Sequence, residues 1–141
     1  MELRVRRGQR EDIRAIERVL GSGHMPLEAR LMRRLVEDVT SDLFVAFDAM
    51  GDVIGVLAIG YRRSLAYGGQ VATVDTLALS GVVEGLRSAL LTFAETRARG
   101  RGCRAIVVSV GVARAADGGE LLARGYEVKE GGVRWLGEES R

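Results

Sequence analysis

Residues 71 to 79, Val-Ala-Thr-Val-Asp-Thr-Leu-Ala-Leu, are mostly β-branched or apolar and predict a β-strand. Residues 80 to 85, Ser-Gly-Val-Val-Glu-Gly, interrupt this pattern with two glycines. A helix is predicted next, because apolar residues recur at helical spacing at Leu86, Ala89, Leu90, Phe93 and Ala94. Such a loop points backbone N–H groups toward a ligand above it, and the helix dipole adds a preference for phosphate. The alternative is an ordinary connection between a strand and a helix.

The composition is that of a globular protein. The chain has 141 residues, of which 47% are hydrophobic and 28% are charged. We therefore expect a single domain over residues 1–141 with a substantial core. No apolar run approaches the ~20 residues of a membrane span, and the N-terminus has no signal-peptide core. We expect a cytoplasmic protein without a membrane partner.

Cysteine and histidine each occur once, as Cys103 and His24. This excludes an internal disulfide, a cysteine zinc cluster and a multi-histidine site, so we expect no metal. A nucleophilic role for Cys103 is not favoured, because no histidine is placed to activate it. His24 precedes a predicted helix, where a loop or capping role is favoured over catalysis.

Positive charge is carried almost entirely by arginine, because Lys129 is the only lysine among the 21 basic residues. This bias is typical of a GC-rich coding sequence, and the net charge is only +2. Arginines between residues 97 and 101 suit the C-terminal end of a helix. Aromatic residues do not alternate with them along the sequence, so we expect no nucleic-acid partner.

The remaining patterns predict the element order βααβββαβαββ. The first helix buries Ile13, Ile16 and Leu20, and the second, starting at His24-Met25-Pro26, carries Leu27, Leu31 and Leu35 in register. Further elements are strands at Leu3–Arg6, Leu43–Phe47, Val53–Ala58 and Ala105–Val110, a polar connection from Arg62 to Gly69, a helix at Ala113–Arg124, and a hairpin of Tyr126–Val128 with Val133–Leu136.

Four stretches carry a family resemblance over nearly the whole chain. They are Arg6-Arg7-Gly8-Gln9-Arg10-Glu11-Asp12, Gly51-Asp52-Val53-Ile54-Gly55-Val56, Thr76-Leu77-Ala78-Leu79 followed by Gly85 to Leu91, and Leu121-Leu122-Ala123-Arg124-Gly125-Tyr126. In this order they resemble the GNAT superfamily of acyl-CoA-dependent N-acetyltransferases. The resemblance implies an α/β (α+β) fold with a mixed, mostly antiparallel sheet and helices on both faces.

The resemblance also implies where acetyl-CoA, or another acyl-CoA, binds. The fourth and fifth strands of this family splay apart, so pantetheine would meet Leu77, Ala78 and Leu79. The pyrophosphate would meet the loop at Glu84, Gly85, Leu86 and Arg87. Here the family pattern is altered, because Val82 stands where Arg or Gln is usual, Arg87 replaces the last glycine, and the loop is about two residues short.

Direct attack of an amine on a thioester needs a base, donors for the oxyanion and stabilisation of the leaving thiolate. Asp75 is the only carboxylate in the 71–79 strand, and either acts as the base or pairs with an arginine. Ser109 and Tyr126 are the candidates near the thiolate, although Tyr126 equally suits a core position. The tyrosine that often serves as general acid maps to Leu121, and the usual asparagine maps near Arg114.

Two functions follow from these observations. The first is an acyl-CoA-dependent N-acetyltransferase acting by direct attack on an unknown small-molecule or peptide amine. The alternative is a catalytically degenerate GNAT-fold module that binds a small ligand or a protein partner. A homodimer is compatible with both.

Overall fold

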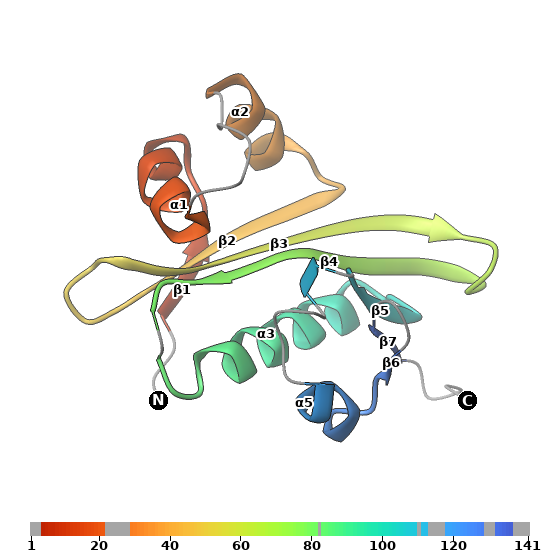
Figure 1. The fold of residues 1–141 in the computed structure, drawn as a ribbon. Helices are drawn as coiled ribbons and strands as arrows, with labels where there is room; N and C mark the ends of the chain where they lie inside the picture. The colour runs from red at the N-terminus through yellow and green to blue at the C-terminus, as the bar shows by residue number, and fades with distance from the viewer. Residues whose placement is uncertain are drawn as a thin grey trace. The chain divides into compact units, whose positions relative to one another are not determined.

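The computed structural model describes residues 4–21, 29–81, 83–109, 111–112, 118–128 and 132–136 (Figure 1). The chain divides into two compact units. The first consists of Met1–Ala58 and Leu77–Leu90, and the second of Ile59–Thr76 and Leu91–Arg141.

The observed elements follow the predicted order. They are β1 (Arg4–Arg7), the short 3-10 helix η1 (Arg10–Asp12), α1 (Ile13–Leu20), α2 (Ala29–Glu37), β2 (Ser41–Phe47), β3 (Val53–Ser64), β4 (Gly69–Leu79), α3 (Leu86–Gly100), β5 (Ala105–Val108), α5 (Gly118–Ala123), β6 (Glu127–Val128) and β7 (Gly132–Trp135).

The described strands form a seven-stranded sheet in the order β1-β2-β3-β4-β5-β7-β6. β1 pairs antiparallel with β2, as do β7 with β5 and β6 with β7, whereas β4 and β5 are parallel. The predicted mixed, mostly antiparallel sheet is therefore confirmed.

In the first unit, helices pack on both faces of the strands. α1 lies over the strands through Ile16 and Val19, which form a cluster with Leu43, Val45 and Val56 (Figure 1). On the opposite face, Gly55 meets the start of α3, because a Cβ there would lie 3.1 Å from Cδ1 of Leu90. A side chain at this position would require Leu90 to shift by a few tenths of an ångström, so glycine suits this close approach.

The corner after β1 is fixed by a bidentate ion pair. Nη1 and Nη2 of Arg6 donate to Oδ2 and Oδ1 of Asp12 at 2.7 and 2.9 Å. The backbone N–H of Gln9 also donates to Oδ2 of Asp12, at 2.7 Å. These bonds lower the pKa of the Asp12 carboxyl, the hydrogen bond from Arg6 being the largest cause. A buried carboxylate thus joins β1 to the beginning of η1.

The second unit is built on the parallel pairing of β4 and β5. Its register runs from Val71↔Ala105 to Val74↔Val108, and all four of these side chains are fully buried. On α3, the residues of this unit that are buried most completely are Leu91, Ala94 and Ala98. β5 lies between β4 and β7, which agrees with its almost wholly apolar sequence.

Two strand predictions require correction. β3 continues to Ser64 instead of ending at Ala58, because Ile59 and Tyr61 remain buried and extend the inward alternation. The predicted polar connection therefore shrinks to the short turn before Gly69. β5 ends at Val108, two residues earlier than expected.

The predictions for the second and fourth helices are met only in part. Leu31 on α2 is 44% exposed, so it does not lie on a buried face as its register predicted. His24, Met25, Pro26 and Leu27 lie outside the described residues, as do residues 113–117 of the predicted fourth helix, which is observed as α5. None of the helices in the described part of the chain is both long and apolar enough to cross a lipid bilayer.

We predict that Asp12→Asn lowers the free energy of unfolding by about 1–2 kcal/mol at neutral pH, since a partly exposed charge-assisted pair is lost. The pKa of Asp12 is lower in the folded protein than in the unfolded chain. The wild type should therefore have the larger free energy of unfolding at pH values above the unfolded pKa, and this difference should disappear as the pH falls through the folded pKa. Urea unfolding of both proteins across the acidic range measures this. An equal difference at all pH values would contradict the role given to the carboxylate.

Candidate functional site

The loop between β4 and α3 has the backbone geometry of a tight strand-to-helix connection. Gly81 and Gly85 have φ angles of 70° and 81°, which favour glycine because a Cβ would be strained there. The N–H of Leu86 donates to the carbonyl of Val83 at 3.2 Å, and the Leu86 side chain is fully buried. Glu84 is exposed and Arg87 is half-buried. The first-turn amides of α3 therefore lie directly after the loop in which the resemblance places pyrophosphate.

The second half of β4 pairs with β3 on one of its two edges. The N–H of Ser80 donates to the carbonyl of Ile54 at 2.9 Å, so pairing with β3 persists to the end of β4. Pairing with β5 ends at Val74↔Val108, and the N–H of Ser109 donates to the Val74 carbonyl at 3.0 Å. Residues 75 to 79 thus extend past the described pairing with β5. Leu77, Ala78 and Leu79, the predicted pantetheine contacts, all lie in this extension.

Asp75 and Ser109 are brought together by the structure. The Ser109 hydroxyl lies 3.5 Å from the Asp75 carbonyl oxygen, and accepts a hydrogen bond from the Val112 N–H at 3.3 Å. The Asp75 side chain is exposed, but neighbouring chain removes part of its hydration and raises the pKa of its carboxyl, while the Thr76 hydroxyl opposes this rise. Within the described residues no arginine pairs with Asp75.

Tyr126 lies in the core, one of the two positions considered for it. It is 3% exposed, and its hydroxyl donates to Oε2 of Glu95 at 2.9 Å. Burial, followed by the neighbouring negative charge of Glu95, raises the pKa of Tyr126 well above its ordinary value. To protonate a thiolate, this hydroxyl would first have to leave Glu95.

Glu95 is the centre of a buried cluster that the sequence analysis did not identify. Oε1 accepts from Arg124 Nη2 and from Arg134 Nη1, each at 3.0 Å, and Glu95 is only 3% exposed. Arg124 also donates to the Thr92 hydroxyl at 2.6 Å. A signal was present in the sequence, because Glu95 falls among Leu91, Ala94 and Ala98 on the inward face of α3. A carboxylate on an apolar helix face requires partners.

Metal-binding and cysteine chemistry find no support in the residues that the structure describes. No group of three or more His, Cys, Asp or Glu side chains in this part of the chain is arranged to hold a metal ion. Cys103 is buried, and burial raises the pKa of its thiol, which is the opposite of what a nucleophilic cysteine requires.

No family model matches the sequence, and no curated protein matches it in a sequence search. Solved structures do match the fold. A transcriptional regulator from Bacillus halodurans C-125 gives a TM-score of 0.78 at 20% identity, covering 91% of this chain and 95% of its own. A GNAT-family acetyltransferase from Staphylococcus aureus Mu50 gives 0.74 at 8% identity, with 96% and 100% covered.

A third match is a GNAT-family N-acetyltransferase, YhbS, from Escherichia coli in complex with CoA. It gives a TM-score of 0.70 at 22% identity and covers 97% of this chain and 83% of its own. These similarities, together with the element order and the mixed sheet, show that the chain has the fold of the GNAT superfamily of N-acetyltransferases.

We predict that Tyr126→Phe lowers the free energy of unfolding by about 1 kcal/mol, because one buried hydrogen bond to Glu95 is lost while its arginines remain. Urea unfolding measures the loss. Any acyl-transfer activity that the wild type shows should be retained by the folded variant, with the same kcat/KM. A large fall in kcat with unchanged stability would instead assign Tyr126 to proton transfer.

Proposed function

We propose that this protein is an acyl-CoA-dependent N-acyltransferase that transfers an acyl group, acetyl in the simplest case, directly to an amine. The observation that carries this proposal is the extension of β4 past its pairing with β5, in a chain with the GNAT fold. Within the described residues, this extension has no strand partner on the β5 side, and its backbone N–H and C=O groups there suit the amides of a pantetheine arm. The related Escherichia coli structure, which holds CoA, supports CoA as the donor.

Residues of the loop and of α3 would receive the CoA phosphates. Gly85 allows the turn, and the backbone amides after it supply donors aided by the helix dipole. Arg87 in the first turn of α3 is the cation of this segment, and Glu84 places a carboxylate three residues before it in the sequence. We infer that this site holds diphosphate more weakly than a loop built from glycines and arginine.

The proposed chemistry assigns a role to each remaining residue. Asp75 accepts the proton of the acceptor ammonium, and its raised pKa makes it a stronger base than an ordinary aspartate. The amine then attacks the thioester carbon, and backbone N–H groups of β4 at Leu77 to Leu79 stabilise the oxyanion. The C–S bond breaks, the second proton of the attacking nitrogen passes to the departing sulfur, and the Ser109 hydroxyl is the side-chain hydrogen-bond donor assigned to that thiolate. The amide product and CoA are released.

A second candidate function is a GNAT-fold module that binds a small ligand or a protein without catalysis. One observation favours it: Tyr126 is bonded to Glu95, while Leu121, at the position of the family's usual acid, is apolar and fully buried. Binding of acetyl-CoA without release of free thiol, across a panel of small amines and peptide N-termini, would select this function. Release of thiol that depends on the amine would select the transferase.

Calorimetric titration with CoA tests the phosphate loop. We predict that Glu84→Gln tightens binding several-fold, because a carboxylate at contact distance opposes the diphosphate by roughly 1 kcal/mol or more at the surface. Arg87→Ala should weaken binding, and both effects should shrink at high salt.

The matched control for this titration is Glu17→Gln on α1, which makes the same charge change away from the loop and should leave CoA affinity unaltered. If neither loop variant changes the affinity, CoA does not use this loop. If wild type and Glu84→Gln both fail to bind at millimolar CoA, the transferase proposal is wrong.

The Asp75→Asn substitution tests whether Asp75 acts as a general base or has only a structural role. We predict a fall in kcat/KM of ~100-fold or more, because the general base is removed. Stability near neutral pH should not fall, because a raised folded-state pKa means that the ionised group stabilises the unfolded chain more than the folded one. Thiol release and urea unfolding measure the two effects. A loss of stability with unchanged activity would show a structural role.

A further inference from the structure

Positive charge is concentrated in two segments of the second unit. Residues 59–74 and 96–109 contain no aspartate or glutamate, and their arginines are Arg62, Arg63, Arg97, Arg99, Arg101 and Arg104. The net charge of the whole chain is only +2. The remainder of the chain is therefore acidic, and these two segments, which we call the basic end, carry the excess of positive charge.

Contacts join the two segments into one surface. The N–H of Arg104 donates to the carbonyl of Gln70 at 2.8 Å. The Arg104 side chain lies against Gly69, since a Cβ on that glycine would lie 2.7 Å from Cγ of Arg104. The Arg101 guanidinium lies 4.0 Å from the ring centroid of Tyr61. Charge that is spread along the sequence is thus gathered at the beginning of β4.

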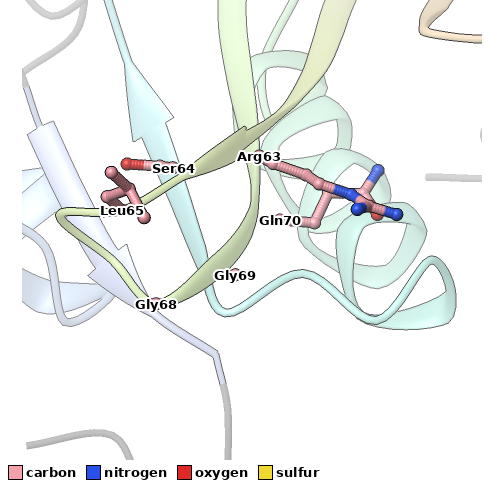
Figure 2. A pocket seen from close by; sticks show the side chains of 6 residues that line it. All are labelled: Arg63, Ser64, Leu65, Gly68, Gly69 and Gln70. Carbon is pink, nitrogen blue, oxygen red and sulfur yellow. The ribbon is translucent and has the colours of Figure 1, made fainter.

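A cavity of about 530 Å³ opens at this surface, around the turn between β3 and β4. Its lining residues are Arg63, Ser64, Leu65, Gly68, Gly69 and Gln70. Figure 2 shows the side chains of Arg63 and Gln70 extending in one direction from the two strands, with Ser64 and Leu65 on the other side. The described residues of the lining thus offer a guanidinium, a hydroxyl, an amide and an apolar side chain, and none of them carries a carboxylate. Leu65 is completely exposed.

Aromatic rings lie among these arginines in space. Tyr67, within the turn that lines the cavity, packs against Trp135 of β7 with ring centroids 5.2 Å apart and planes inclined by 53°. Both residues are half-buried, so part of each is accessible. Tyr61 lies below Arg101. Aromatic and basic residues that are apart in the sequence therefore lie close together in the folded second unit.

We propose that the basic end binds single-stranded nucleic acid, with arginines on the phosphates and with bases against the cavity and the Tyr67–Trp135 pair. Guanidinium groups match phosphate oxygens, and aromatic faces stack bases without selecting a sequence. An acidic peptide would use the arginines but not the rings. A membrane surface would require more exposed apolar residues than Leu65 at this end. Of the residues assigned to acyl transfer, only Ser109 falls within the basic end, after β5 and at the opposite end of that strand from Arg104, and none of them lines the cavity.

Trp135 is the only tryptophan in the chain, so its fluorescence emission reports on binding at this surface. The full chain is titrated with oligothymidylate of about 12 nucleotides, within the ~4–16 nucleotides of known single-strand sites. We expect quenching of Trp135 and a logarithm of affinity that falls linearly with the logarithm of salt concentration. Arg62→Gln with Arg63→Gln, both exposed, should weaken binding and reduce that slope by about 1.4, since each lost phosphate contact removes about 0.7.

Arg14→Gln with Arg18→Gln on α1 is the matched control, because it removes the same charge from exposed positions of the first unit. Its affinity and slope should equal those of the wild type. The proposal is overturned by absence of binding at low salt, by an equal loss in the control, or by displacement of the oligonucleotide by CoA. Binding of polyglutamate or of phosphatidylserine vesicles as tightly as the oligonucleotide would also overturn it, in favour of an acidic protein or a membrane.

Discussion

The short parallel pairing of β4 with β5 is the constraint on which the proposed sites depend. Parallel neighbours need a crossover, and α3 supplies it. Because Val71 pairs with Ala105, the segment after α3 must return to the beginning of β4, which brings Arg104 against Gly69. Because β5 ends at Val108, the end of β4 extends beyond it. One register thus places Arg104 at one end of β4 and, in the part of the chain that the structure describes, leaves backbone groups at the other end without a β5 partner.

The Glu95 cluster fixes the elements that follow β5. Its carboxylate accepts from Arg124, after α5, from Arg134 in β7 and from Tyr126 between them. Removing a carboxylate from water is unfavourable unless such bonds replace its hydration, so the cluster favours the arrangement in which all of them form together. The hydroxyl of Tyr126 is part of that compensation. In this cluster the Tyr126 hydroxyl is bonded to a buried carboxylate, whereas the Asp75 side chain is exposed.

Structural features that depend on residues close together in the sequence could be predicted. Features that depend on contacts between residues far apart in the sequence could not. The strand, loop and helix from Val71 to Gly100 follow from β-branched residues, glycines and helical spacing, and all three are observed. The length of β3 was underestimated because Arg62 and Arg63 were interpreted as a connection, whereas their backbone still pairs in the sheet. The partners of Glu95, which are Arg124, Tyr126 and Arg134, lie about thirty to forty residues away in the chain, and no local pattern indicates them.

The arginines near the end of α3 show why charge must be considered in three dimensions. A helix C-terminus favours cations, and this accounts for Arg97 and Arg99 without any ligand. It does not account for Arg62 and Arg63, which lie on β3, or for Arg104, which follows the loop. The dipole of α3 acts mainly within its last turn, so these three residues gain little from it. The two segments that carry these arginines contain no aspartate or glutamate of their own, and an anionic partner reduces the repulsion among their positive charges.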